Sequence, residues 1–454
     1  TNVAVTTNSY DQSETTIAIS PLNSNNTLAA WNDFRVINGN GYSKAGYAFS
    51  TNNGTTWSEK ILVPPTGYLN GFDPSVAYDR YGNSFYCYVA YLIGPIGNIY
   101  VSRTTNLNNV DWPDQIVSEN NHYNDKPFMA VDNTGGSKDG RIYVSWTDFS
   151  GYSSAIKFSY STDHGVNFST PITFSSNPLN PGLGAQLMPR NTIPENPTAG
   201  FVQGSMPTVG PNGEVYIIWA EVTNGGVYNG GAFKIKKSTD GGISFGATST
   251  VCQFTPRAYS IGTPAQLDIR TYLPSMATDP TTGYIYVAFT DQASQSNTNA
   301  RVKFVRSTDC GISWSNPSTL ADFGIGWQVM PWVCADKNGR VSILFINSSD
   351  LTSVDSYLIE SFNNGLSFYS PLRVSSQSSN PANSLWSHHY MGAANINGGD
   401  SYCIWTDYRG GNADPNFSLA NSMYYYATQN KSINYDATFS NNSHIIERGY
   451  FGKL

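Results

Sequence analysis

Short apolar segments recur along the whole chain, and a polar turn rich in Gly, Asn, Ser or Thr follows most of them. One type of segment begins near a proline and ends in a sequence like Ala-x-Asp, as in Asp73–Asp79 and Leu273–Asp279. A second, more continuously apolar type follows the next turn and ends in an aromatic residue, one further residue and an acid, as in Trp146–Asp148. No segment has the period of an amphipathic helix. The pattern therefore predicts an all-β protein of many short strands.

The two segment types alternate in about seven repeated units. The first strands of these units are Ser13–Ser20, Asp73–Asp79, Asp125–Asp132, Met206–Pro211, Leu273–Asp279, Met330–Asp336 and His388–Asn395. A third and usually a fourth strand follow the second, which is the composition of a propeller blade. We therefore expect one β-propeller of about seven four-stranded blades over residues 1–430, followed by a C-terminal tail over residues 431–454.

The two ends of this predicted ring are complementary. The last unit lacks a fourth strand, and Asn2–Thr7 resembles the fourth strands of the other units. We expect this N-terminal strand to complete the last blade and close the ring, because closure removes exposed sheet edges.

A turn motif, Ser-x-Asp/Asn-x-Gly-x-x-Trp/Phe, recurs between the third and fourth strands. Its copies are Ser50–Trp57, Ser161–Phe168, Ser238–Phe245, Ser307–Trp314 and Ser361–Phe368. The Asp or Asn side chain is suited to accept backbone N–H bonds within the turn, and Gly supplies a positive φ. The aromatic residue then packs beneath the turn. The motif therefore predicts a structural hairpin, and we assign no catalytic role to its acids.

The motif resembles the Asp box of sialidases and related propellers. This resemblance covers about residues 1–430 and implies the propeller fold, boxes on the face opposite the active site, and a connection to carbohydrate. It does not imply sialidase activity, because the first inner strand, Ser13–Ser20, carries no arginine where sialidases have an Arg-Ile-Pro-like sequence. About seven blades is closer to the ulvan-lyase and rhamnosidase-type propellers.

Composition narrows the classes of partner and compartment. Charged residues make up only 13% of the chain, aromatic residues 14%, and the net charge is −7. No basic stripe is present to neutralise phosphates, so we expect no nucleic-acid partner. No apolar run approaches the roughly 20 residues that a transmembrane helix needs, so we expect no transmembrane segment. The polar, weakly charged surface favours a secreted or cell-surface protein.

The resemblance places the site on the face where each first strand begins. The acids that end the second strands meet at this face, and we expect them to bind sugar hydroxyls or a cation, or to act as acid and base. They are Asp33, Asp148, Glu221, Asp291 and Asp407. The alternative is that each acid caps the turn after its strand.

Two arginines depart from the repeat. Arg35 and Arg409 each follow the acid of their blade by two residues, in the first and last units only. These blades are neighbours in a closed ring, so the two guanidinium groups are predicted to hold a carboxylate or sulfate together. The alternative is a pair of inter-blade salt bridges with the neighbouring acids.

The entrances of particular first strands supply the catalytic candidates. His388, His389 and Tyr390 open the last blade, His122 opens the third, and Arg270 and Tyr272 open the fifth. A uronate lyase uses Arg or His to neutralise the acid and Tyr or His to abstract a proton, and a Tyr is also able to act as a nucleophile. We therefore treat His122 as substrate-binding and the other five as catalytic. The alternative is that they line the central channel. The long connections Pro171–Ser205 and Cys252–Tyr272 are expected to form walls of this face.

The sequence leaves two functions open. The first is an extracellular protein that binds or processes a glycan, as a glycosidase or a polysaccharide lyase. The alternative is a non-catalytic adhesive or structural protein of the cell surface, whose partner would be another surface protein. We expect no required cofactor, with Ca²⁺ as an optional ligand of the oxygen-rich turns.

Overall fold

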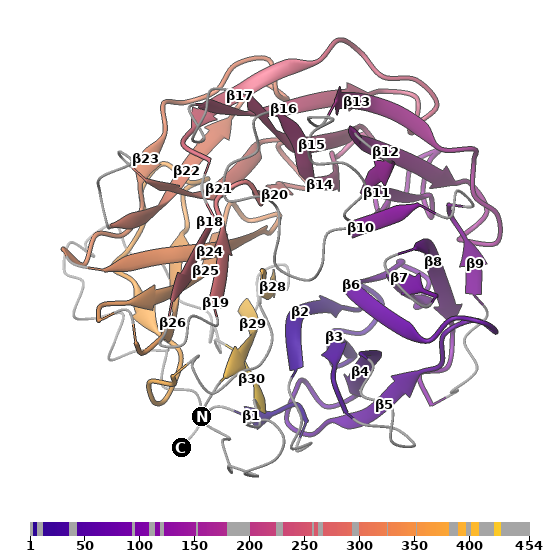
Figure 1. The fold of residues 1–454 in the computed structure, drawn as a ribbon, viewed down its shortest axis with the longest axis horizontal. Coiled ribbons are helices and arrows are strands. Elements are labelled where there is room, and N and C mark those ends of the chain that lie inside the picture. The colour runs from indigo at the N-terminus through magenta and orange to yellow at the C-terminus, as the bar shows by residue number, and fades with distance from the viewer. Residues whose placement is uncertain are drawn as a thin grey trace.

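The computed structural model describes residues 3–6, 12–35, 43–92, 96–108, 114–118, 122–150, 153–178, 200–223, 230–256, 258–261, 267–292, 299–324, 326–350, 352–380, 389–395, 401–407 and 422–427. Within these ranges the regular secondary structure is entirely β, apart from turns. Antiparallel sheets of four strands stand in a ring around a central axis, with the first strand of each sheet innermost (Figure 1). The predicted all-β propeller is confirmed.

Six blades are built from four consecutive strands each. The first two contain β2 (Gln12–Ile19), β3 (Thr27–Asp33), β4 (Lys44–Ser50) and β5 (Ser58–Leu62), then β6 (Asn70–Tyr78), β7 (Ser84–Tyr91), β8 (Gly97–Thr104) and β9 (Asp114–Ile116). The next two contain β10 (Tyr123–Val131), β11 (Ile142–Ser150), β12 (Ser153–Ser161) and β13 (Ile172–Pro178), then β14 (Phe201–Val209), β15 (Val215–Thr223), β16 (Gly230–Ser238) and β17 (Ser249–Phe254). The last two contain β20 (Ser275–Thr278), β21 (Ile285–Gln292), β22 (Ala300–Ser307) and β23 (Ser318–Thr319), then β24 (Trp327–Ala335), β25 (Val341–Ser348), β26 (Asp355–Ser361) and β27 (Leu372–Arg373).

A further four-stranded sheet combines the two ends of the chain. It contains β28 (Gly392–Asn395), β29 (Ser401–Asp407) and β30 (Ser422–Ala427), and β1 (Val3–Ala4) forms its outer edge. Val3 pairs with Tyr425 and Ala4 with Tyr424, antiparallel. The N-terminal strand therefore closes the ring, as the sequence predicts. The tail predicted over residues 431–454 lies outside the described residues.

A short hairpin departs from the blade pattern. β18 (Ala258–Ile261) pairs with β19 (Leu267–Arg270) in the connection between β17 and β20. This hairpin occupies the connection Cys252–Tyr272 and delivers Arg270 to the start of the next blade. Most of the other long connection, Pro171–Ser205, lies outside the described residues.

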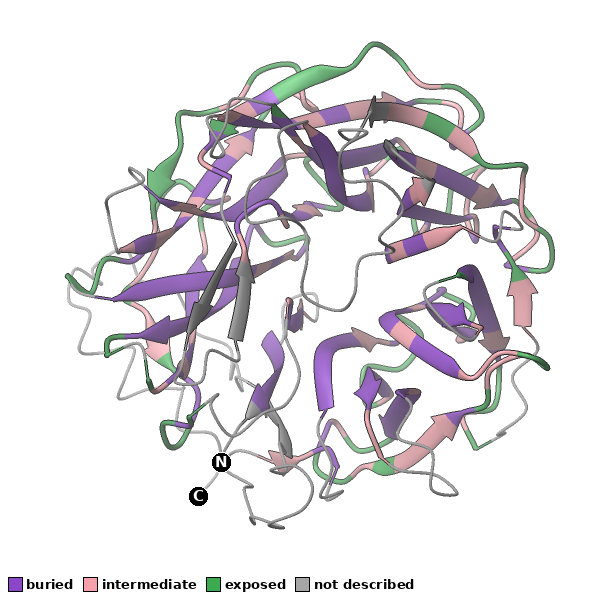
Figure 2. Ribbon diagram, in the orientation of Figure 1, coloured by how far each residue is buried: buried purple, intermediate pink, exposed green. Residues whose placement is uncertain are grey.

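The hydrophobic core lies between neighbouring blades. The second strand of each blade is enclosed on both faces, and Figure 2 shows these strands as mostly buried. Their aromatic residues Trp31, Trp146, Trp219 and Trp405 are at most 1% exposed. Cys87 and Cys403 are buried free thiols within the same strands, so they act as small apolar side chains.

The five copies of the turn motif fold identically. In each copy the serine hydroxyl accepts the glycine N–H at 2.8–3.0 Å. The same hydroxyl donates to the Asp or Asn oxygen at 2.7–2.9 Å. That oxygen also accepts the N–H four residues later, at 2.9–3.0 Å. Every motif glycine has a positive φ. The motif is a structural hairpin, and strand direction places it on the face opposite the start of the first strands.

Candidate functional site

A β-bulge near the start of the first strand turns one residue of each blade toward the axis. The register shifts by one residue in five blades, after Ser13, Phe72, Asp125, Gln203 and Val329. The residue after each of these positions adopts a left-handed backbone; these residues are Glu14, Asp73, Lys126, Gly204 and Met330. A bulge re-aims a side chain, and such a backbone costs about 1–3 kcal/mol in a residue other than glycine.

The fifth blade and the closing sheet have residues at the same register. Glu14 lies two residues before Thr16, which pairs with Ala30. Leu273 and Tyr390 lie two residues before Ser275 and Gly392, the first paired residues of their strands. The ring of bulge positions is therefore charged in the first three blades and uncharged in the other three blades and the closing sheet. The full ring is Glu14, Asp73, Lys126, Gly204, Leu273, Met330 and Tyr390.

The charged half of this ring is a buried ionic cluster. The Lys126 ammonium lies 2.5 Å from Glu14 Oε1 and 3.0 Å from Asp73 Oδ1. The three side chains are only 3–7% exposed. Asn32 donates to Glu14 Oε2 at 2.9 Å and accepts the Asp73 N–H at 2.8 Å. Each buried charge therefore has a partner, which offsets part of the cost of removing it from water.

The two carboxyl groups of the cluster have opposite electrostatic environments. Burial raises the pKa of Glu14, but the Lys126 ammonium and hydrogen bonds from Asp73 and His389 outweigh it and hold that pKa well below its usual value. Burial and the Glu14 charge raise the pKa of Asp73 well above its usual value. Burial lowers the pKa of Lys126, but the neighbouring Asp73 and Glu14 carboxyl groups outweigh burial and raise that pKa above its usual value. Glu14 is therefore the ionised acid, and Asp73 is the acid that retains a proton.

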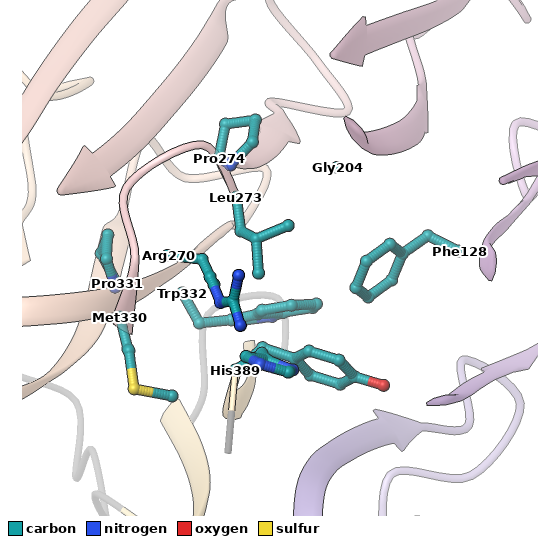
Figure 3. Close-up of a pocket in the computed structure, with 10 residues that line it drawn as sticks. Phe128, Gly204, Arg270, Leu273, Pro274, Met330, Pro331, Trp332 and His389 are labelled. Carbon is teal, nitrogen blue, oxygen red and sulfur yellow. The ribbon is translucent and has the colours of Figure 1, made fainter. Parts of the chain in front are cut away.

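The uncharged half of the ring borders a pocket on the axis. Its lining contains Gly204, Arg270, Leu273, Met330 and His389. Phe128, Trp332 and Tyr390 also line it, and their ring centroids lie 5.2–6.0 Å from one another. Figure 3 shows Arg270 extending into this space above Trp332 and His389, with Phe128 facing them from the opposite side. The pocket as a whole admits little more than a water-sized group.

Three of the predicted catalytic residues meet here. His389, Tyr390 and Arg270 share the pocket although they come from two different blades. His389 Nδ1 lies 2.5 Å from Glu14 Oε1, which joins the pocket to the ionic cluster. Arg270 donates to the Tyr272 hydroxyl at 2.7 Å. Tyr272 is 1% exposed and so supports Arg270 from behind. His388 lies outside the described residues.

Tyr390 has surroundings that hold its proton in place. Its hydroxyl donates to the Pro74 carbonyl at 3.3 Å, and its ring lies 5.2 Å from the Lys126 ammonium. Burial and the Glu14 charge raise the pKa of Tyr390 well above its usual value. The Tyr390 hydroxyl therefore keeps its proton.

The acids that end the second strands have local partners. Asp33 accepts the Trp31 indole N–H at 2.9 Å. Asp148 lies 2.9 Å from His122 Nδ1, and Asp291 accepts the Thr255 N–H at 2.9 Å. Glu221 is half-buried and Asp407 ends β29. Asp33 also accepts the Arg35 N–H at 3.0 Å, which is the turn cap expected as the alternative, whereas the partner of Asp291 belongs to an earlier connection. Asp148 is 2% exposed, and the side chain of its partner His122 is 42% exposed.

Arg35 lies within its own blade. It forms an ion pair with Asp33 at 2.6 Å and a second one with Glu59. Burial lowers the pKa of Arg35, but its hydrogen bonds and charge contacts with Asp33 and Glu59 raise it overall. Arg409 lies outside the described residues. Arg35 is therefore paired within its own blade, and the inter-blade salt bridge expected as the alternative is not what Arg35 forms.

Sequence reasoning missed the ionic cluster. The repeat predicts Glu14, Asp73 and Lys126 only as parts of first strands. Charged residues inside otherwise apolar strands are nevertheless a signal of a buried ionic contact. A second signal is the proline that directly follows the bulge position in Asp73-Pro74, Lys126-Pro127 and Met330-Pro331. A proline cannot donate to the sheet ladder, so it marks a bulge within a strand.

The described ranges contain no group of three or more His, Cys, Asp or Glu side chains arranged to hold a metal ion. No helix among the described residues is long and apolar enough to cross a membrane.

Comparisons with known proteins extend the description of the fold. No family model matches the chain, and no curated protein matches it. Among solved structures, an ulvan lyase described as a new polysaccharide lyase family has a TM-score of 0.56 and 11% identity, over 93% of this chain and 95% of that one. The same type of enzyme bound to -[GlcA(1-4)Rha3S]- has a TM-score of 0.55, at the same identity and coverage.

A glycoside hydrolase shares the architecture at similar distance. The arabinanase of Penicillium chrysogenum in complex with arabinobiose has a TM-score of 0.51 and 12% identity, over 80% of this chain and 96% of that one. At identities this low, the structural likeness shows a shared propeller fold alone. The structural neighbours are thus carbohydrate-active propellers.

Proposed function

We propose that this protein is an extracellular polysaccharide lyase that binds a uronate-containing glycan at the axial pocket. The observation that carries the proposal is the meeting of Arg270 and His389 in one pocket, with Glu14 fixing the imidazole. We also propose that the chain belongs with the Asp-box propellers, that it has seven blades when the closing sheet is counted, and that it works outside the cell or on the cell surface. The identical turns and the weakly charged composition support these statements.

The proposed chemistry is proton abstraction next to a carboxylate. Arg270 binds the uronate carboxylate and stabilises the negative charge that develops when the C5 proton leaves. The ionised Glu14 accepts a hydrogen bond from His389 Nδ1, so Nε2 becomes the basic atom of the neutral imidazole. Nε2 takes the C5 proton, the C5–H electrons form the C4=C5 double bond as the C4–O bond breaks, and the leaving oxygen keeps the C4–O electrons and receives the proton back from His389 Nε2. Tyr272 positions Arg270.

A hydrolase is the second candidate. Glu14 and Asp73 are paired carboxyl groups whose pKa values are pushed apart, which is the condition for an acid and a base in glycoside hydrolysis. Both are almost completely buried and already occupied by Lys126. Because of this burial we favour the lyase, in which Glu14 acts through its hydrogen bond with His389.

The test is a screen of uronate polysaccharides with two readouts. We expect both new reducing ends and the ultraviolet absorbance of an unsaturated uronate. Arg270→Lys should raise KM and lower kcat, and His389→Gln should lower kcat at least about 100-fold. Reducing ends without absorbance would establish the hydrolase instead. A folded protein that is silent in both readouts would favour the non-catalytic adhesive or structural alternative.

A further inference from the structure

Five aromatic side chains form a continuous row across the first three blades. Phe34 and Phe72 lie 6.1 Å apart between ring centroids, and Phe72 and Tyr91 lie 5.7 Å apart, both edge-on. Tyr123 stacks on Tyr91 at 6.0 Å and on Phe149 at 5.4 Å. We call this row the aromatic stripe. Its members stand where first strands begin and second strands end, which is the face of the pocket.

The stripe breaks the repeat. Phe34 and Phe149 directly follow the acids Asp33 and Asp148, and Tyr91 holds the same register in the second blade. The equivalent residues of the next three blades are Val222, Gln292 and Ser348. Since those blades fold without an aromatic ring at this position, the architecture does not require one. The last unit has Tyr408 at this position, outside the described residues, and among the six blades the three aromatics occur in those that also carry the ionic cluster.

The stripe has the polarity of a sugar-binding surface. Phe34, Phe72, Tyr123 and Phe149 are half-buried, and only Tyr91 is buried, at 7% exposure. The ion pairs Arg35–Asp33 and His122–Asp148 flank the row. A sugar ring has an apolar C–H face and a rim of hydroxyl groups. Flat aromatic rings with charged neighbours match both parts.

The stripe and the pocket share strand β10, which supplies Tyr123 to the stripe and Phe128 to the pocket lining. Because the pocket admits little more than a water-sized group, the sugar rings of a bound chain must lie on the surrounding face.

We propose that the aromatic stripe stacks against the sugar rings that neighbour the residue held at the pocket, so that the protein binds internal stretches of a polysaccharide chain. The inference rests on the proposed function and adds a preference for chain length. Two additional sugars on the stripe should tighten binding about tenfold, which corresponds to about 1.4 kcal/mol.

The experiment measures binding of oligosaccharides of alternating glucuronate and 3-sulfated rhamnose by calorimetry. Di-, tetra- and hexasaccharides are titrated into the wild-type protein, and also into the His389→Gln background to keep the probes intact. The test variants are Phe34→Leu and Phe149→Leu, which retain apolar volume but remove the flat face. Phe323→Leu is the matched control, because Phe323 is an aromatic residue of the same face, 41% exposed and tilted against Tyr357, outside the stripe.

The outcomes separate the two proposals. We expect binding to tighten with length, and we expect the stripe variants alone to lose this gain while their disaccharide affinity stays within about twofold. Length-independent binding by the wild type, or a length gain that survives in both stripe variants, would overturn the stripe and leave the proposed function standing. Failure of the wild type to bind any of the three lengths would overturn the proposed function, and the stripe with it.

Discussion

At the scale of single residues, the site depends on a buried cation that sets the state of two acids. Lys126 contacts both Glu14 and Asp73, and the lowered pKa of Glu14 leaves it ionised beside His389. The raised pKa of Asp73 makes it a neutral donor in the same contact. One charge therefore compensates one charge, and the second carboxyl group is accommodated by its proton.

Replacing the cation should cost much more stability than replacing the protonated acid. Lys126→Met leaves Glu14 as a buried anion whose ammonium partner is gone, so we expect a loss of about 3–5 kcal/mol in the free energy of unfolding at neutral pH. Asp73→Asn retains a donor and should cost less than about 1.5 kcal/mol. Denaturant unfolding of both variants measures the difference, and equal losses would contradict this assignment of charge.

The free energies of unfolding of the wild type and of Lys126→Met should converge in acid. In the wild type the pKa of Glu14 is lowered by folding, so its stabilising contribution is present above its unfolded pKa and disappears as pH falls. In Lys126→Met the pKa of Glu14 should instead be raised by burial, so that protonation relieves the variant. The stability difference measured at neutral pH should therefore shrink toward about pH 4, the usual value for a carboxyl group. A difference independent of pH would show that Glu14 does not report on Lys126.

At the scale of elements, the two turn-like features of each blade divide structure from function. The five hairpin motifs on one face are uniform in sequence and hydrogen bonding, so they were predictable from the repeat. The bulges on the other face hold different residues in each blade, and only their geometry repeats. Sequence therefore predicted the blades and the entrances at Arg270 and His389. It missed Glu14 and Lys126, which are 112 residues apart, because only the ring brings them into contact.

Removing a hairpin acid should weaken the fold and leave the site unchanged. The Ser313 hydroxyl and N–H and the Ser307 hydroxyl lower the pKa of Asp309 to about 2. We expect Asp309→Ala to cost about 1 kcal/mol at neutral pH, because these hydrogen bonds are lost. Since the folded pKa is lowered, this contribution should be lost as pH falls from about 4 through about 2. Thr308→Ala, at an exposed position of the same turn, is the control, and a loss of glycan binding in Asp309→Ala would contradict the assignment of this face.

The bulge of the fourth blade should be intolerant of a side chain. Gly204 has a φ of 71°, and a Cβ there would stand 2.7 Å from the Tyr272 carbonyl oxygen. Gly204→Ala should cost about 1–3 kcal/mol and shift Tyr272, which holds Arg270, so KM for the glycan should rise. Gly246→Ala is the matched control, because its nearest atom would be 3.7 Å away. Normal kinetics in Gly204→Ala would show that Tyr272 does not position Arg270.

At the scale of the whole molecule, the site requires a closed ring. Glu14 belongs to the first blade and His389 to the closing sheet, and they lie 375 residues apart in the chain but 2.5 Å apart in space. The closing sheet gains its fourth strand from β1, and Val5 just after that strand is 3% exposed in the core between these two sheets. Thr6 donates to Glu59 at 2.6 Å in the first blade. The N-terminal segment therefore contacts both the first blade and the closing sheet, and Glu14 and His389 meet across the junction between these two sheets.

Deleting residues 1–7 should consequently loosen the site as well as the fold. Loss of Val5 burial, the strand pairing and the Thr6 contact should lower the free energy of unfolding by at least about 2 kcal/mol. Because Glu14 and His389 stand on opposite sides of the opened junction, kcat should fall more than KM rises. A synthetic peptide of residues 1–7 should restore both stability and kcat in a saturable way, since it supplies the missing edge strand, and a scrambled peptide should not. An unchanged unfolding midpoint, or recovery of stability without recovery of kcat, would show that ring closure and the alignment of Glu14 with His389 are independent.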